Sequence, residues 1–175
     1  MAYAAGGTFA GDIESKRLYL VLTTPVSRTR VVVEKTIALL TPLLVLNLVI
    51  PLVVFASTVA IDYPLDPVYL LAVHELSIPY HLVCLGIGQL LSVTFSRGNT
   101  AQLGGIATVF LLFLLDSVTV GTDLEWLGDV SPTRYIDPTE ILLHENIYVG
   151  DSLLLFAVTL LLLFLSVVRF HDRDI

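Results

Sequence analysis

Charged side chains are scarce in this chain, at 14% of 175 residues, whereas 55% of the residues are hydrophobic. Soluble domains carry about 25% charged and about 45–50% apolar residues. Several apolar stretches also reach the length of about 20 residues that a helix needs to cross a bilayer. The composition therefore excludes a water-soluble globular fold and a disordered chain.

Cysteine is nearly absent as well. Cys84 is the one cysteine and lies in an apolar run, which excludes a disulfide framework. Basic residues number 9 against 16 acidic ones, and the formal net charge is -7. A nucleic-acid partner would require a basic face, so we expect no nucleic acid. No signal peptide is visible, because residues 1–11 lack a basic region followed by an apolar one.

Four apolar stretches predict an all-α integral membrane protein with four transmembrane helices. The predicted spans cover about residues 36–61, 68–95, 100–120 and 151–168. Residues 1–35 are expected to form a cytoplasmic N-terminal segment, and residues 36–175 the four-span membrane domain. Pro42 and Pro51 lie inside the first span, and membrane helices tolerate proline.

Basic residues predict the orientation of the spans, because Lys and Arg in short flanking loops stay in the cytoplasm. Every basic residue except Arg134 lies before the first span, between the second and third spans, or after the fourth. Acidic residues gather mainly in the opposite loops. We therefore expect a multi-pass protein of the plasma membrane with both termini in the cytoplasm.

The outer connection before the last span is long. Asp137 and Pro138 have the pattern of a helix start, with an acid at the N-cap and proline in the first helical position. Trp126, Tyr135 and Tyr148 are of the residue types that lie at headgroup level. We expect a short interfacial helix on the outer surface.

Three ionisable residues inside the second span, His74, Glu75 and His81, form a candidate intramembrane polar site, because such groups are costly in a membrane and often mark a pathway or a pair. A zinc-protease helix would need a second histidine at position 78, which is Ile. No metal site is therefore predicted. A polar stripe with small residues is also typical of a helix-packing face, the interpretation that we favour. Asp116 lies near the outer end of the third span, where ionisation costs little.

Catalytic patterns are missing from the sequence. No Ser/His/Asp set, Cys/His cluster or carboxylate pair can be assembled, and no phosphate-binding GxxxxGK[ST] loop occurs. We therefore predict that the chain is not an enzyme and has no catalytic, metal or cofactor-binding residues. If ATP drives the protein, another chain hydrolyses it.

The segment before the first span is also informative. Residues 11–22 predict one short amphipathic helix on the cytoplasmic surface, which Thr24-Pro25 ends because proline disfavours helix in the residue before it. The next helix is capped either by Thr24, with Pro25 in its first position, or by Ser27. The residues alone support a membrane anchor and a docking surface equally.

Three strings follow one another here: GDIESKRL (11–18), LTTPVSR (22–28) and VEK (33–35). Together they resemble the signature of type-2 ABC exporter permeases, although SKR (15–17) replaces the usual Gly-Thr pair. The ending FHDRDI (170–175) and the long outer segment before the last span are also similar to that family. Its members usually have six spans, so the resemblance implies a permease that lacks the first two.

The resemblance implies a function and partners. In that family, the helix before the PVSR element is a coupling helix in a groove of an ATPase subunit, which holds the ATP. The permease works with a second copy or a related permease chain. The chain would then be the membrane subunit of an ATP-driven exporter; the alternative is a non-transporting scaffold or a truncated remnant. The residues that match the coupling helix and its exit are Asp12, Glu14, Arg17, Leu18, Leu22, Pro25 and Arg28.

Overall fold

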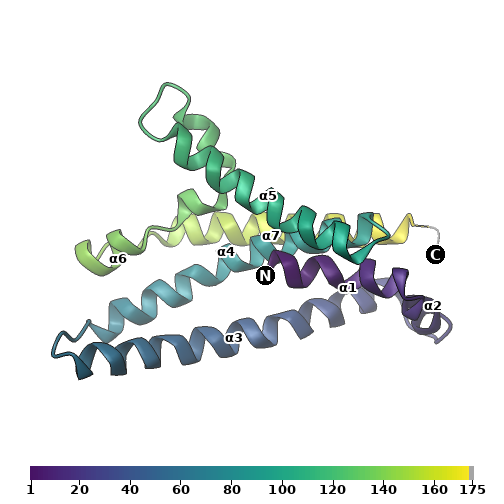
Figure 1. The fold of residues 1–175 in the computed structure, drawn as a ribbon, viewed down its shortest axis with the longest axis horizontal. Helices are drawn as coiled ribbons and strands as arrows, with labels where there is room; N and C mark the ends of the chain where they lie inside the picture. Colours follow the sequence, from purple (N-terminus) through teal and green to yellow (C-terminus); the bar gives the residue numbers. More distant parts are fainter. Residues whose placement is uncertain (174–175) are drawn as a thin grey trace.

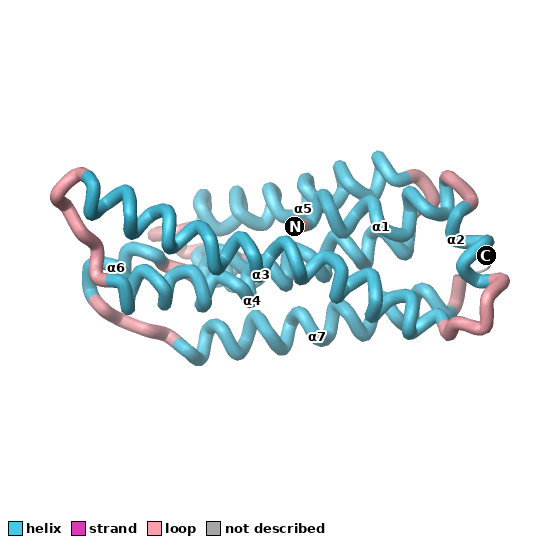
Figure 2. Tube along the Cα trace, turned by 90° about the horizontal axis from the view of Figure 1, so that it is seen from below, coloured by secondary structure: helices cyan, strands magenta, loops and turns pink. Residues whose placement is uncertain are grey.

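The computed structural model describes residues 1–173, which form helices and connecting loops (Figures 1 and 2). Within this range, four helices are long and apolar enough to cross a membrane: α3 (Arg28–Ala60), α4 (Pro67–Thr94), α5 (Gly98–Thr119) and α7 (Val149–His171). The prediction of an all-α integral membrane protein with four spans is confirmed.

Five shorter elements complete the chain. They are α1 (Ala2–Glu14), α2 (Arg17–Leu22), the 3-10 turns η1 (Glu125–Val130) and η2 (Pro132–Tyr135), and α6 (Pro138–His144). Figure 1 shows α3, α4 and α7 running lengthwise, whereas α5 diverges from them toward its C-terminal end. The turns and α6 follow α5 in the long connection to α7.

Side-chain caps define where three of the helices begin. The Ser27 hydroxyl accepts a hydrogen bond from the Arg30 amide at 3.2 Å, so Ser27 rather than Thr24 caps α3. Asp66 caps α4, directly before a proline in the first helical position. Asp137 caps α6 in the same way and accepts from two amides of the first turn. Helix α6 thus begins where the sequence predicted a short helix, since an acidic cap followed by proline favours a helix start.

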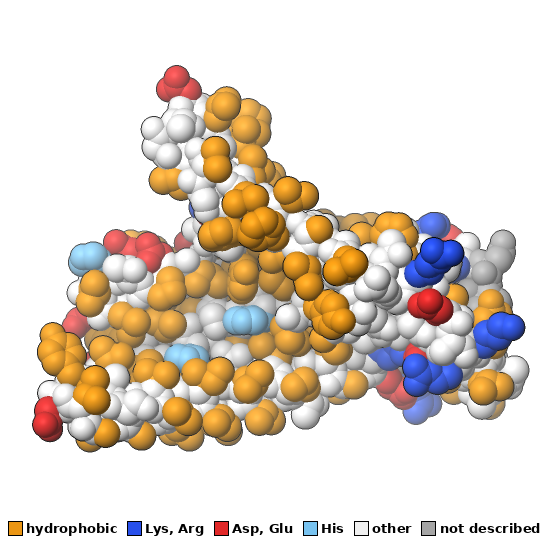
Figure 3. All heavy atoms as spheres, viewed as in Figure 1, with side chains coloured by type: hydrophobic (Ala, Val, Ile, Leu, Met, Phe, Trp, Pro, Cys, Tyr) orange, Lys and Arg blue, Asp and Glu red, His pale blue; other side chains and the backbone are white. Residues whose placement is uncertain are grey.

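The two ends of the molecule differ in charge, as Figure 3 shows: lysine and arginine side chains gather at one end together with some acidic ones, whereas acidic side chains predominate at the other, the acidic end. We call the first the basic end; it is formed by α2, the start of α3, the α4–α5 connection and the end of α7. With 33 residues, α3 is about 50 Å long at the helical rise, more than a hydrocarbon core of about 30 Å. It is therefore longer than a bilayer core requires, and Arg28, Arg30 and Lys35 all lie in its first turns.

The N-terminal helix α1 is packed against two of the long helices. It packs along α4 and α5, and its buried residues recur with helical spacing: Ala2, Ala5, Gly6, Phe9 and Ala10. Small residues allow such helices to approach closely. A Cβ atom on Gly105 of α5 would lie 3.0 Å from the Ala2 carbonyl oxygen, and one on Gly88 of α4 would overlap it. The glycines of both spans thus make room for the α1 backbone.

The single helix expected over residues 11–22 is wrong, because the chain turns at Lys16. This residue adopts a left-handed conformation with φ 59°, and the Ser15 hydroxyl donates to the Gly11 carbonyl at 2.7 Å. A side chain that bonds the backbone in this way competes with continued helix. The turn separates α1 from α2 and allows Leu18 to be fully buried.

A compact core fills the basic end. Its buried members come from five different helices and are Phe9, Leu18, Val31, Val32, Val93 and Phe170. The rings of Phe9 and Phe170 lie with centroids 5.0 Å apart and tilted by 58°, in the range that favours aromatic pairs. This core holds α1, α2, α3, α4 and α7 together at the basic end.

Candidate functional site

The exposed side of α2 is the strongest candidate for a docking surface. Tyr19, Leu20 and Val21 are 47%, 71% and 39% exposed at the basic end. Arg17 and Pro25 are also exposed on either side of them. We call these five residues the elbow patch, because they lie where the chain bends from α2 into α3. Exposed apolar residues with a charged rim are typical of a protein or membrane interaction site.

Asp12, one of the predicted contacts, faces inward toward α3. Its carboxylate lies 2.5 Å from the Lys35 Nζ and 3.3 Å from the Arg17 Nε. The Lys35 ammonium also donates to the Thr8 carbonyl at 2.7 Å. The Asp12 carboxylate is therefore engaged within the chain by two cations, and its bond to Lys35 ties α1 to α3.

Glu14 makes a similar link to α5. Its Oε2 accepts a hydrogen bond from the Gly98 amide at 2.8 Å, at the first residue of a helix whose own N-cap, Arg97, provides no side-chain cap. A carboxylate at a helix N-terminus is favourable because it satisfies a free amide and opposes the helix dipole. Glu14 therefore caps α5 from outside.

Two other predicted contacts are apolar and packed. Leu18 is fully buried in the core at the basic end, and Leu22 packs against the same core. A docked subunit cannot reach the Leu18 side chain without unfolding α2. Of the seven residues matched to the coupling helix and its exit, Arg17 and Pro25 lie on the elbow patch.

Arg28, the last of them, points to the end of α7. Its Nη1 donates to the carbonyls of Phe170, His171 and Arg173 at 2.8, 3.1 and 2.6 Å. Its guanidinium carbon also lies 5.6 Å from the centre of the Phe170 ring, a cation–π distance. The positive charge thus neutralises the negative end of the α7 dipole.

Arg173, which the sequence analysis did not single out, makes the matching contact to α4. Its Nη1 donates to the Val93 and Phe95 carbonyls at 2.7 and 2.9 Å, and its Nη2 to the Ser96 hydroxyl at 2.6 Å. Burial, followed by the charge of Arg169, lowers the pKa of this guanidinium from its ordinary value. A basic residue directly after a helix end is the signal that could have indicated this role.

The three ionisable residues of α4 do not form a joint site. The Nδ1 atoms of His74 and His81 contact the carbonyls of Leu70 and Ser77 at 2.9 and 2.8 Å, so both donate to the preceding turn. Glu75 is exposed. Among the described residues, no group of His, Cys, Asp or Glu is arranged to hold a metal ion.

A cavity of about 270 Å³ lies between α4 and the connection from α5 to α7. It is lined by Ser77, Tyr80, His81 and Thr133, among others. Polar groups from α4 and from the outer connection thus meet at the same cavity. Closer to the C-terminal end of α4, Cys84 is buried and Gly88 packs against α1.

At the acidic end, Arg134 forms a cluster with three carboxylates. It lies 3.4 Å from Asp116, 2.8 Å from Glu125 and 2.9 Å from Asp129, and Thr133 donates to Asp116 at 3.1 Å. The hydrogen bond to Glu125 is the main factor that raises the pKa of Arg134. The cluster fastens the end of α5 to the two turns that follow it.

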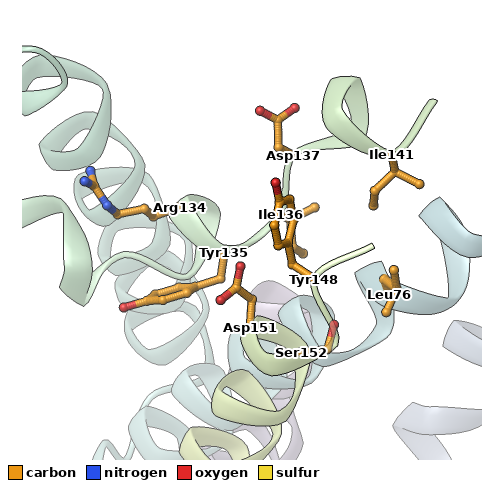
Figure 4. Close-up of a pocket in the computed structure, with 9 residues that line it drawn as sticks. All are labelled: Leu76, Arg134, Tyr135, Ile136, Asp137, Ile141, Tyr148, Asp151 and Ser152. Carbon is orange, nitrogen blue, oxygen red and sulfur yellow. The ribbon is translucent and has the colours of Figure 1, made fainter. Parts of the chain in front are cut away.

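Next to this cluster, a cavity of about 130 Å³ lies between η2, α6 and α7. Figure 4 shows Asp151 and Tyr135 side by side in it, whereas Asp137 and Arg134 point away. Asp137 is occupied as the cap of α6, and burial raises the pKa of Tyr135. The cavity therefore offers one uncommitted carboxylate, Asp151, and no acid–base pair.

The fold and these sites define a multi-pass helical membrane protein. The family model described as ABC-2 family transporter protein matches residues 1–175, so the chain belongs to that family. Permease domains of this family are membrane components without catalytic activity of their own. No curated protein and no solved structure gives a significant match to the chain.

Proposed function

We propose that the chain is the permease subunit of an ATP-driven exporter. In this proposal, a separate ATPase subunit binds and hydrolyses ATP, and the permease moves substrate across the plasma membrane. Family membership supports the permease role. The observation that carries the coupling step is the elbow patch, which exposes Leu20 and its neighbours at the basic end.

The position of α2 suits the transmission of force. Leu18 anchors one side of the helix in the core, while Leu20 lies exposed on another side. A push on the exposed side would therefore move the core-bound α1 and α3 along with α2. Coupling requires an element that has different contacts in two states, and a short helix held on one side provides such an element.

The distribution of charge supports the orientation. The ATPase subunit would dock at the basic end, because basic residues stay on the cytoplasmic side. Both termini would then face the cytoplasm. A second permease copy or a related permease chain would complete the transporter in the lipid membrane, and ATP would stay on the partner subunit.

The test is purification of the tagged chain from its native membranes in mild detergent, with intact-mass analysis of every retained protein. We expect the wild-type chain to retain an ATPase subunit. Leu20→Asp places a charge in the elbow patch and should abolish this retention, without changing the amount of inserted chain. Val130→Asp is the matched control, because Val130 is 64% exposed at the acidic end, and it should retain the ATPase.

Equal retention by Leu20→Asp would refute the elbow patch as the docking surface. Recovery of the wild-type chain without any ATPase would refute the exporter proposal and favour the scaffold or remnant alternative instead.

A further inference from the structure

Two arginines at the basic end each bond a helix other than their own. Arg28 is the first residue of α3, and its guanidinium donates to carbonyls at the end of α7. Arg173 follows α7, and its guanidinium donates to carbonyls at the end of α4 and to Ser96. Arg28 thus links the start of α3 to the end of α7, and Arg173 links the end of α7 to the end of α4.

These bonds use the chemistry of helix ends. The last four carbonyls of a helix have no partner within the helix, and a cation there also opposes the dipole. The planar guanidinium presents several N–H donors in a fixed arrangement, so that it can bond several carbonyls at once. A lysine ammonium is a point charge on a flexible stem, so it fixes the directions of its bonds less strictly. Each arginine therefore fixes the distance and direction between two helices.

The bonds form a continuous series from the elbow to the membrane helices. Movement of α2 reaches Arg28 through the short connection to α3. From Arg28 it passes to the end of α7, then through Arg173 to the end of α4 and the connection to α5. We propose that Arg28 and Arg173 are positioning residues that transmit a displacement of the elbow to α7 and α4. This inference rests on the proposed function, because it requires an ATPase that moves the elbow.

Arg30 provides the contrast within the same turn of α3. Its Nε bonds Glu34 at 2.7 Å, and both side chains are more than half exposed. Because this pair lies within one helix, it links no two elements. Arg30 therefore shares the charge and the depth of Arg28 but lacks its connection, and makes a matched control.

The experiment uses the complex with the ATPase subunit and measures a distance between two spin labels. Cys84→Ser removes the native thiol, and Ile61→Cys and Val149→Cys place labels at exposed outer ends of α3 and α7. The distance distribution is recorded without nucleotide and with ATP plus vanadate. ATP hydrolysis by the same samples shows whether the partner is still bound and active.

We expect an ATP-dependent shift of this distance in the otherwise wild-type complex. Arg28→Lys and Arg173→Lys should each lower the ratio of shifted to unshifted molecules by about five-fold or more, the lower range of allosteric coupling. The double variant should lower this ratio no further than the more severe single variant does, because the two links act in series. Arg30→Lys should leave the ratio unchanged.

A ratio equal to wild type in either single variant would overturn the inference, and so would a wild-type complex with no shift. If a lysine variant fails to assemble, Ser96→Ala replaces it; this change removes one acceptor of Arg173 and should lower the ratio by a smaller factor. An unchanged ratio in Ser96→Ala would then refute the link. A wild-type sample that contains no ATPase refutes the proposed function itself.

Discussion

Substitution of Gly6 tests the close contact between α1 and α5. A Cβ atom on Gly6 would lie 2.8 Å from the Ala101 carbonyl oxygen and 2.8 Å from the Gln102 Cα. Both neighbours are backbone atoms of a long helix, so they cannot turn aside as a flexible side chain would. Gly6→Ala should therefore push α1 away from α5. Gly11→Ala in the same helix is the matched control, because nothing lies within 4 Å of its Cβ position.

The expected magnitude follows from two opposing effects. Overpacking costs about 1–3 kcal/mol, whereas alanine is more favourable than glycine inside a helix by roughly 0.5–1 kcal/mol. Gly6→Ala should thus lower the free energy of unfolding by up to about 2 kcal/mol, and Gly11→Ala should raise it by roughly 0.5–1 kcal/mol. For a chain of this size, 1 kcal/mol corresponds to roughly 2–4 °C in the melting temperature.

The assay is thermal unfolding of the purified chain in one detergent, followed by tryptophan fluorescence or by loss of the monodisperse peak. Gly6→Ala should melt several degrees below wild type, and Gly11→Ala at or slightly above it. If Gly6→Ala were as stable as Gly11→Ala, α1 would not lie between α4 and α5, and the placement of the first helix would be refuted.

Two further substitutions test the basic end and the acidic end by the same melting assay. Leu18→Ala should lower the free energy of unfolding by about 2–5 kcal/mol, because removal of a fully buried leucine side chain leaves a cavity. Leu20→Ala should change it by less than about 0.5 kcal/mol. Equal effects would contradict the burial pattern of α2. Arg134→Met should lower the melting temperature, because it leaves the largely buried Asp116 carboxylate without its guanidinium partner. A melting temperature equal to wild type would show that the cluster does not hold the end of α5.

The four spans could be predicted from the sequence because each is long, apolar and bounded by polar turns. The cap at Asp137 was also predicted, since an acid before a proline is a local signal. Asp66 carries the same signal before α4, although the sequence analysis did not use it. The packing of α1 was not predicted, because its buried face consists mainly of alanine and glycine, which contribute little to hydropathy. The spacing of Ala2, Ala5, Gly6, Phe9 and Ala10 is the signal that could have indicated a closely packed membrane helix.

The candidate site was less predictable, because its contacts join distant parts of the chain. The partners of Asp12 and Glu14 lie 23 and 84 residues away, so a local motif could show that these residues are charged but not that they bond within the chain. The turn at Lys16 also changes which side of α2 faces the core. A helical wheel drawn through residues 11–22 therefore misplaces the residues of α2 relative to those of α1.

The distribution of contacts at the basic end separates two tasks. Asp12, Glu14, Arg28 and Arg173 all bond other helices of the same chain, so their charges hold the helices in place. The surface that remains available on α2 is mainly apolar and is presented by Tyr19, Leu20 and Val21. Docking at the elbow patch would then depend on shape and on the burial of apolar surface. The response of the spans would depend on the charged bonds within the chain. Substitutions of Tyr19, Leu20 or Val21 should therefore weaken binding of the ATPase. Substitutions of the four charged residues should weaken the response to ATP while the ATPase stays bound.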